Sequence, residues 1–486
     1  MTRAPGISGF SLQVPKLRVP LAAWAEWTDA DPSKVEAVVG RSFRVCSPRQ
    51  NVYTLAADAV LDLIERFDVD PADIGMLALG TESSTDNAAG AVLVRGMLDE
   101  VLPGRGRGPV ARTCEVPEFK HACLGGVYAL KAAARYLGAD GRGRRAIVVA
   151  SDIAEYERGS TGEQTQGAGA VAMLLDTDPA LCHLNLDRSG SASAYRGLDF
   201  RKPFARHRDP SYAQATQRLH DFPIFNGTYS TQCYVEATVR AIDAMFERVE
   251  GPRADFYDRV AAVCCHRPYE HMPMQAMAAV LVWSAAKDGG AAALAPMCEG
   301  TDLDPAQVYE EIKMAPDLYA RVKADGIAAA PFPAFMALTR VFRRSPAFKA
   351  FASSKLRLGN TITADLGNLY TASLPGWLGA AFEAAHAEDR ELAGRDLLAV
   401  GYGSGDAAEA IPMTVAAHWR EAAAKLDFTA SLQGAHDLTR EQYEALHDGA
   451  AVDGLPEPPG FVVSRVGETY DERFQDLGVD YYDFCG

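Results

Sequence analysis

The chain lacks the features that mark secreted and membrane-inserted proteins. Met1 to Phe10 contains no apolar stretch behind a basic start, so we expect no signal peptide. The longest apolar run, around Met272 to Ala286, is shorter than the roughly 20 residues that span a bilayer, and we interpret it as a buried helix. These absences predict a cytoplasmic protein that does not enter a membrane.

Paired cysteines and an excess of positive charge are also missing. The nine cysteines are scattered, with no C-x-x-C pair and no cysteine–histidine cluster at metal-ligand spacing, which predicts reduced thiols and argues against a metal site. The 48 basic and 64 acidic residues give a formal charge of −16, which argues against nucleic acid as a partner. Basic clusters at 105–112, 142–145 and 201–208 are local exceptions, although solvated loops explain the first two at least as well.

What the chain does contain is an alternation of buried strands and helices. Continuous apolar runs, typical of strands covered on both faces, predict strands at Ile74–Gly80, Ala146–Ala150, Val260–Cys265 and Leu397–Gly401. Helical patterns lie between them, at Tyr53–Phe67, Gly126–Leu137, Gln232–Val249 and Leu374–Ala387. The sequence therefore predicts an α/β protein.

The order of these elements is repeated in the two parts of the chain. We predict a first half over residues 1–178 and a second over 179–486, each with two helix-to-strand units. The second half carries extra residues, about 287–358, which we expect to form added helices because long structureless loops are rare in compact domains. No low-complexity linker separates the halves, so we expect them to pack together.

Cys123 is the cysteine best placed to act as a nucleophile. It directly precedes a helical run, and the positive end of a helix favours the thiolate. The glycines that follow would let a substrate approach the backbone, where free N–H groups could stabilise an oxyanion. Taken alone, Cys123 could equally be a small buried hydrophobic residue.

Three further polar residues occupy matching places in the two halves. Glu82 follows the first strand and His266 follows the third, at the strand ends where open α/β folds bind ligands. A partly desolvated Glu82 could move protons, and His266 could donate to a thioester carbonyl. Asn368 opens the helix that pairs with the Cys123 helix, so all four side chains should meet near a pseudo-twofold axis.

Two glycine-rich strings, Thr165–Met173 and Gly401–Asp406, match neither a P-loop nor a dinucleotide fingerprint. We therefore reject nucleotide binding of that type. We interpret both strings as tight backbone turns that line a tunnel for a thioester.

The chain resembles the 3-hydroxy-3-methylglutaryl-CoA synthases from about Gly9 to beyond Asp406. The motifs that carry the resemblance occur in the family's order: T-E-S-S-T-D, A-C-L-G-G, V-V-A-S-D-I-A-E-Y, G-A-G-A-V-A-M-L-L, L-D-F-R-K-P, F-P-I-F-N-G-T-Y-S-T-Q-C-Y, H-R-P-Y, G-N-L-Y-T-A-S-L and Y-G-S-G. The resemblance implies a thiolase fold with five αβαβα layers, a homodimer, and no metal or redox cofactor.

The resemblance also implies a reaction and roles. Cys123 would take an acetyl group, Glu82 would act as general acid and base, and His266 would orient an acetoacetyl thioester that the acetyl enolate attacks. Residues expected to contact substrate are Asn368, Ser404, Asp199, Thr165, Tyr402 and His271. Arg201, Lys202 and Arg206 are weaker candidates for the phosphates of coenzyme A or of an acyl-carrier protein.

The chain departs from the family at three places. K-H-A-C replaces the common T-N-A-C, Gln166 replaces a glycine, and His271 stands where a basic residue is frequent. The lysine before the cysteine resembles the branch that adds β-methyl groups to carrier-bound polyketides, so carrier-linked substrates stay open beside coenzyme A. A ketoacyl synthase III-like enzyme and a catalytically silent partner subunit are the remaining alternatives.

Overall fold

The computed structural model describes residues 4–84, 86–199, 222–224, 226–328 and 330–486, and it has the predicted α/β architecture. Its strands are β1 Gly6–Gln13, β2 Leu17–Pro20, β3 Ser42–Val45, β4 Ile74–Gly80, β5 Glu118–Phe119, β6 Arg145–Ala154, β7 Gly167–Asp176, β8 Cys182–Leu184, β9 Gly190–Ser193, β10 Ala262–Cys265, β11 Asp396–Gly403, β12 Ala407–Val415, β13 His436–Asp437, β14 Gly460–Val466 and β15 Asp480–Cys485.

Helices connect and cover these strands. They are α1 Leu21–Trp27, α2 Pro32–Val38, α3 Val52–Arg66, α4 Gly90–Val101, α5 Gly125–Gly138, α6 Thr228–Phe246, α7 Arg253–Arg259, α8 His271–Cys298, α9 Pro305–Met314, α10 Leu318–Asp325, α11 Pro333–Phe342, α12 Pro346–Lys355, α13 Asn360–Thr363, α14 Ser373–Ala387, α15 Trp419–Ala423, α16 Phe428–Ser431 and α17 Arg440–His447. None of the described helices is both long and apolar enough to cross a membrane.

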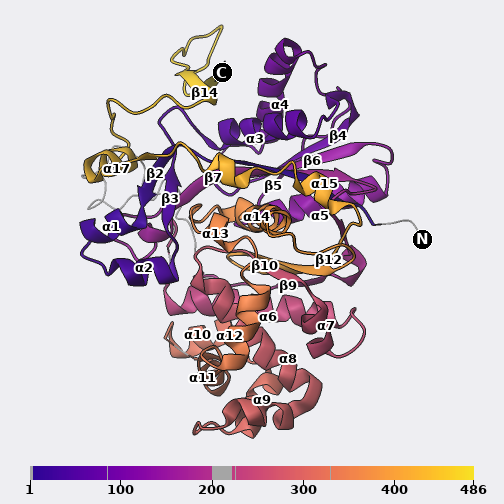
Figure 1. Cartoon of the computed structure of the whole chain (residues 1–486). Helices are drawn as coiled ribbons and strands as arrows, with labels where there is room; N and C mark the ends of the chain where they lie inside the picture. Colours follow the sequence, from indigo (N-terminus) through magenta and orange to yellow (C-terminus); the bar gives the residue numbers. More distant parts are fainter. Residues whose placement is uncertain (1–3, 85, 200–221, 225, 329) are drawn as a thin grey trace.

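The elements form five layers (Figure 1). Helices α3 and α4 cover a first layer of strands, α5 and α14 lie in the middle, and α6 and α8 cover a second layer of strands. In the first half β4 pairs parallel with β6 and β6 pairs antiparallel with β7. In the second half β10, β11 and β12 repeat this pattern. The thiolase fold is thus confirmed, and the short strand β8 joins the two halves through pairs with β1 and β12.

The four predicted strands and four predicted helices are all present, but the interpretation of one glycine string was wrong. Residues 167–176 are not a turn, because they form the fully paired strand β7. A Cβ atom on Gly167 would lie 2.5 Å from the backbone oxygen of Asn368, so the glycine lets the connection to α14 cross close over the strand. Only Ser404–Asp406 of the second string form a turn, between β11 and β12.

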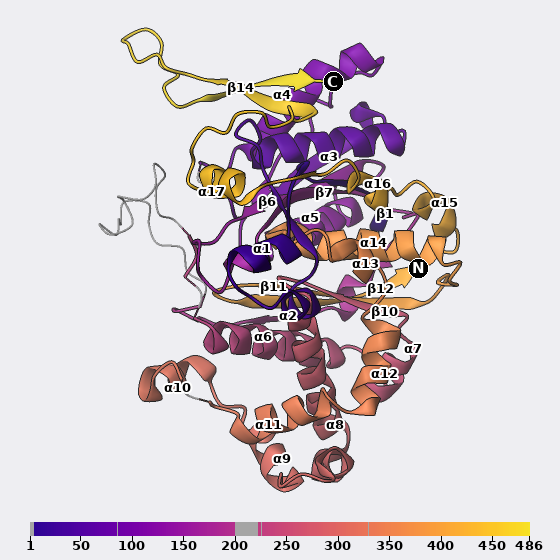
Figure 2. The same ribbon diagram turned by 60° about the vertical axis from the view of Figure 1, so that its left-hand side comes forward.

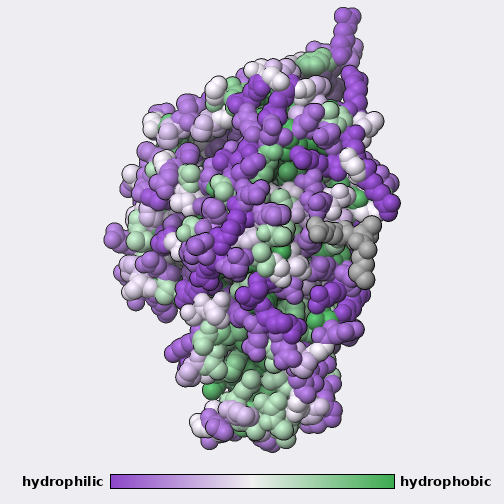
Figure 3. Space-filling view, turned by 45° about the vertical axis from the view of Figure 1, so that its right-hand side comes forward, coloured by the Kyte–Doolittle hydropathy of each residue, from purple (hydrophilic) through white to green (hydrophobic). Residues whose placement is uncertain are grey.

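The extra segment of the second half forms helices, as expected. Side chains of Asp304, Asp317 and Ser345 cap the starts of α9, α10 and α12, and proline occupies the first turn of α9, α11 and α12. With the second half of α8, which kinks at Gly290, these helices build a lobe beneath α6 (Figure 2). The lower end of this lobe, where α8 and α9 lie, carries the most extensive hydrophobic surface in the view of Figure 3.

The last part of the chain returns to the first half. Strand β13 pairs with β2, and the hairpin β14–β15 packs on α3 and α4. Phe461 is 2% exposed, and its N–H donates to the Asp58 carboxylate of α3 at 2.9 Å. The sequence did not indicate this contact between the end of the second half and the first half.

Candidate active site

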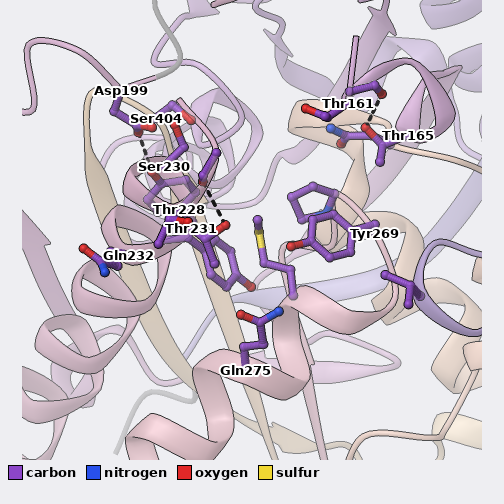
Figure 4. A pocket seen from close by; sticks show the side chains of 18 of the residues that line it. Thr161, Thr165, Asp199, Thr228, Ser230, Thr231, Gln232, Tyr269, Gln275 and Ser404 are labelled. Atoms are coloured by element: carbon purple, nitrogen blue, oxygen red, sulfur yellow. Dashed lines mark hydrogen bonds between the residues drawn. The ribbon is translucent and has the colours of Figure 1, made fainter. Parts of the chain in front are cut away.

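One cavity of about 600 Å³ collects side chains from both halves of the chain. The predicted residues that line it are Cys123, Thr165, Asp199, His266, Asn368, Tyr402 and Ser404. Figure 4 shows Asp199, Ser230 and Ser404 on one side of the space and Thr161 and Thr165 on the other. The structure therefore places most of the predicted site residues around a single cavity.

Cys123 lies just before α5, where the sequence placed it. Its side chain is 6% exposed and packs with Ala154, Tyr156 and Tyr370. The preceding residue, Ala122, has φ +41°, a left-handed conformation that non-glycine residues rarely adopt. This sharp turn directs the thiol into the cavity instead of along the helix.

The two glycines after Cys123 have a different role from the predicted one. A Cβ atom on Gly125 would lie 2.7 Å from the backbone oxygen of Phe119, and one on Gly126 would lie 2.8 Å from that of Thr371. Neither glycine lines the cavity. They allow the start of α5 to pack closely against neighbouring backbone. The glycines therefore permit close contact between protein segments, and not the approach of a substrate.

Glu82 is half-buried and is not among the residues that line the cavity. Its charge nevertheless contributes, after burial, to the raised pKa of Tyr156, a residue of the cavity wall. The backbone N–H of Glu82 donates to the buried carboxylate of Asp152 at 2.8 Å. The same carboxylate accepts from Ser83 and, through its second oxygen, from the N–H of Thr371 at 2.9 Å. Asp152 therefore holds together the segments that carry Glu82 and Asn368.

His266 follows β10 and is 2% exposed. Its ring stacks on Tyr402 with centroids 6.2 Å apart, and its carbonyl accepts a hydrogen bond from Tyr234 at 2.7 Å. Burial lowers the pKa of His266 to about 3, so the imidazole is neutral near pH 7. Its Nδ1 atom has no hydrogen-bond partner among the described residues. A neutral ring of this kind keeps one N–H that can donate to the carbonyl oxygen of a bound thioester.

Asn368 precedes a short 3₁₀ turn, Tyr370–Ala372, that leads into α14. Its side-chain oxygen accepts from the N–H of Tyr370 at 3.0 Å, and its Nδ2 donates to the hydroxyl of Tyr156 at 3.1 Å. Both amide atoms are thus fixed, which orients the side chain toward the cavity beside Cys123. Tyr156 is a wall residue that sequence reasoning missed, although it closes the quoted motif S-D-I-A-E-Y.

Asp199 and Tyr402 form the opposite wall. The Tyr402 hydroxyl donates to Asp199 at 2.7 Å, and the N–H of Gly405, next to Ser404, donates to the same oxygen at 3.3 Å. Burial raises the pKa of Asp199. The carboxyl therefore anchors the β11–β12 turn and, through Tyr402, the face of His266.

Of the remaining predicted residues, His271 does not join the cavity. His271 begins α8 and is half-buried, but the cavity is lined by its neighbours Met272 and Gln275. Burial, followed by the charge of Arg343, lowers the pKa of His271. Arg201, Lys202 and Arg206 lie outside the described residues.

Two departures from the family pattern have structural partners. Lys120 donates to the carbonyl and the hydroxyl of Ser84 at 2.6 and 2.7 Å, which ties the Cys123 turn to the segment after Glu82. The side-chain oxygen of Gln166 accepts from the N–H of Tyr156 at 3.0 Å, and its Nε2 donates to Tyr443 of α17 at 2.7 Å. Gln166 thereby links the cavity wall to α17.

The added lobe supplies wall residues that sequence reasoning did not find. Helix α11 contributes Pro333, Met336 and Arg340 to the cavity, and Arg343, the residue that follows the helix, also lines it. No local pattern marks them, because only the packing of α11 against α8 brings them near Cys123.

Two repeated α/β halves around one shared cavity define a protein of the thiolase fold. Family models for the N-terminal and C-terminal parts of hydroxymethylglutaryl-coenzyme A synthase match residues 2–180 and 346–449. The chain belongs to the hydroxymethylglutaryl-CoA synthase family, whose named members are enzymes that condense acyl thioesters.

Individual relatives are distant but extend over most of the chain. The hydroxymethylglutaryl-CoA synthase of Haloferax volcanii is 28% identical over 402 residues, which cover 82% of this chain and 80% of that protein. The cytoplasmic enzyme of Gallus gallus is 25% identical over 437 residues, 88% of this chain and 74% of that one.

Solved structures resemble the whole chain. MvaS in complex with 3-hydroxy-3-methylglutaryl coenzyme A superposes with a TM-score of 0.75, at 26% identity and full coverage of both chains. The curacin pathway HMG synthase in complex with acetyl donor-ACP superposes with a TM-score of 0.70, at 18% identity, covering 99% of this chain and 100% of that one. The second likeness concerns the fold alone.

Proposed function

We propose that this chain transfers an acetyl group to Cys123 and condenses it with the 3-keto carbon of an acetoacetyl thioester, giving a 3-hydroxy-3-methylglutaryl thioester. The observation that carries the proposal is the convergence of Cys123, His266 and Asn368, from two repeated halves, on one cavity. Membership of the family supports the same reaction.

The first step is acyl transfer. The Cys123 thiolate attacks the carbonyl of the acetyl donor, and the donor's thiol leaves with the proton that Cys123 gave up. The positive end of α5 favours the thiolate. The low exposure of the side chain keeps water from the acetyl thioester until the second substrate binds.

The second step forms the carbon–carbon bond. Glu82 removes a methyl proton from acetyl-Cys123, the enolate carbon attacks C3 of the acetoacetyl thioester, and the new C3 alkoxide takes a proton back. Neutral His266 donates to the acceptor, since its imidazole retains one ring N–H. Water then hydrolyses the Cys123 thioester, which releases a free carboxylate and restores the thiol. The steps are acyl transfer, proton transfer, addition of an enolate to a ketone and hydrolysis, none of which changes the substrates' overall oxidation level, so the proposed reaction needs no metal or redox cofactor.

Intact mass spectrometry after mixing with acetyl-CoA tests the first step. We expect a gain of about 42 Da in the wild type, as acylation chemistry requires, and no gain in Cys123→Ala. Cys46→Ala is the matched control, because this half-buried thiol is outside the cavity and should leave the adduct intact. A wild type that gains no acetyl group from any acetyl thioester would overturn the proposal.

A chase with acetoacetyl thioester tests the second step. We expect it to discharge acetyl-Cys123 in the wild type and to leave the adduct in place in Glu82→Gln, which cannot accept the methyl proton.

We also propose a homodimer in the cytoplasm, as the resemblance implies. Light scattering of the purified chain would give the mass of one protomer if the dimer is wrong.

A further inference from the structure

The added lobe contains a basic stretch in an otherwise acidic chain. Between Gly326 and Ala364 there are six basic residues and no acidic residue, whereas the whole chain has a formal charge of −16. The six are Arg340, Arg343, Arg344, Lys349, Lys355 and Arg357. Residues 326–345 of the stretch, with Arg340, Arg343 and Arg344, lie between the two segments that the family models match, whereas its remaining basic residues lie in the second matched segment.

The basic stretch lies at the cavity. Arg340 and Arg343, from the C-terminal end of α11, are themselves lining residues. The chain then turns through Arg344 into α12, which carries Lys349, and Figure 2 shows α11 and α12 in the lobe beneath α6. Positive charge therefore extends from the cavity wall onto the surface beside it.

Four of these cations have no counter-charge among the described residues. Within the described residues, no carboxylate oxygen lies within salt-bridge distance of Arg340, Arg343, Arg344 or Lys349. The other two are engaged, because Lys355 donates to backbone carbonyls and Arg357 pairs with Glu270 at 3.5 Å. Burial, followed by the charge of Arg344, lowers the pKa of Arg343, as expected where cations are grouped without an anion.

We propose that Arg340, Arg343, Arg344 and Lys349 form a docking surface for an acidic acyl-carrier protein, which delivers a thioester to Cys123 on its phosphopantetheine arm. These four residues are called here the α11–α12 surface. The proposal rests on the proposed function, and it identifies the carrier of the substrate. Arg340 and Arg343, at the cavity, face the phosphate of the arm. Arg344 and Lys349 do not line the cavity and meet carboxylates of the carrier.

Charge complementarity favours a protein carrier over coenzyme A. The cations continue outside the cavity, onto exposed positions that a coenzyme reaching Cys123 has no need to occupy. An acidic protein is repelled by the net negative charge of the rest of the chain, so this local patch would also dictate its orientation. The α11–α12 surface would thus both attract the carrier protein and determine its orientation.

Binding of a carrier to Arg344→Glu/Lys349→Glu tests the surface. The probe is the acidic, free-standing acyl-carrier protein of a bacterial fatty-acid synthase in its holo form, with affinity measured by fluorescence anisotropy. We expect the Kd to rise at least about 10-fold and its salt dependence to fall, because two attractive charges become repulsive. Arg112→Glu/Arg142→Glu is the matched control, since it changes two exposed arginines that have no ion-pair partner in the described part of the chain and do not line the cavity.

Kinetics separate the carrier from coenzyme A. We expect the double variant to raise the KM for acetoacetyl-carrier at least about 10-fold more than the KM for acetoacetyl-CoA, a difference of about 1.4 kcal/mol. Equal effects on both substrates would assign the cations to phosphates of the coenzyme and overturn the carrier. Wild type that does not bind the holo carrier would overturn it as well.

The same samples distinguish failure of this surface from failure of the proposed function. A chain that is acetylated at Cys123 by acetyl-CoA but does not bind the carrier keeps the function and loses the surface. A chain that binds the carrier through the α11–α12 surface without acylation keeps the surface and loses the function. Thermal unfolding of each variant checks that the charge reversals leave the fold intact.

Discussion

The neutral state of His266 has a measurable effect on stability. Burial places its pKa at about 3, whereas an exposed histidine in the unfolded chain has a pKa of about 6.5. Below about pH 6.5, His266 binds a proton in the unfolded chain but stays neutral in the folded chain. The stability that His266 contributes is therefore complete above that pH and is lost progressively as the pH falls toward about 3.

The size of the effect follows from the two pKa values. At pH 5 the unfolded histidine is almost fully protonated and the folded one is not, which costs about 2 kcal/mol relative to pH 8. Two buried carboxyls act in the opposite direction. Burial raises the pKa of Asp58 and of Asp406 to about 8, so their contributions are lost as the pH rises toward 8. A wild-type profile alone would mix these effects.

A comparison with His266→Asn isolates the histidine. Urea unfolding of both proteins at about pH 8 and about pH 5 gives four free energies, from which the contributions of the carboxyls cancel. We expect the stability of the variant, relative to wild type, to improve by about 2 kcal/mol at the lower pH. A change below about 0.5 kcal/mol would refute a buried neutral His266. A single histidine ring resonance that does not titrate between about pH 5 and 9 and disappears in His266→Asn should accompany the expected result.

Three further predictions concern groups behind the cavity, and urea unfolding measures each of them. Asp152→Asn replaces an accepting oxygen by an NH₂ group, should cost about 3 kcal/mol, and contradicts the proposed anchoring if it costs less than about 1. Gly126→Ala should cost about 1–3 kcal/mol, because its new Cβ atom would lie 2.8 Å from a backbone oxygen. The control Gly96→Ala, whose Cβ atom would have nothing within 4 Å, should stabilise the protein by about 0.5–1 kcal/mol. Equal effects of the two substitutions would argue against tight packing at the start of α5. Lys131→Met leaves the buried Glu409 without its cation and should cost about 3–5 kcal/mol, most of which a second change, Glu409→Met, should restore.

The fold could be predicted from the sequence where the signal is local. Strand β4 has the predicted bounds, Ile74–Gly80, because a strand buried on both faces leaves a continuous apolar run. The prediction of a turn at Thr165–Met173 was wrong, because glycine occurs in a strand where another backbone segment crosses closely, as well as in turns. Glycine content alone does not distinguish these two uses.

The site was predictable where a polar residue ends an apolar strand or begins a helix. Cys123 and His266 are of this kind, and the structure places both at one cavity, while their chemical roles stay predictions. Asp152 was not predictable, because its donors lie 70 residues earlier, at Glu82, and 219 residues later, at Thr371. The contribution of α11 was hidden for the same reason, since it depends on tertiary packing.

The position of the β14–β15 hairpin on α3 has a consequence for synthesis of the chain. Ribosomes deliver the first half long before Phe461, the residue that inserts against α3 and bonds to Asp58. Until then the nascent first half presents an uncovered apolar surface, the kind of surface that holdase chaperones bind. Folding of this half is therefore completed only after the β14–β15 hairpin has been synthesised.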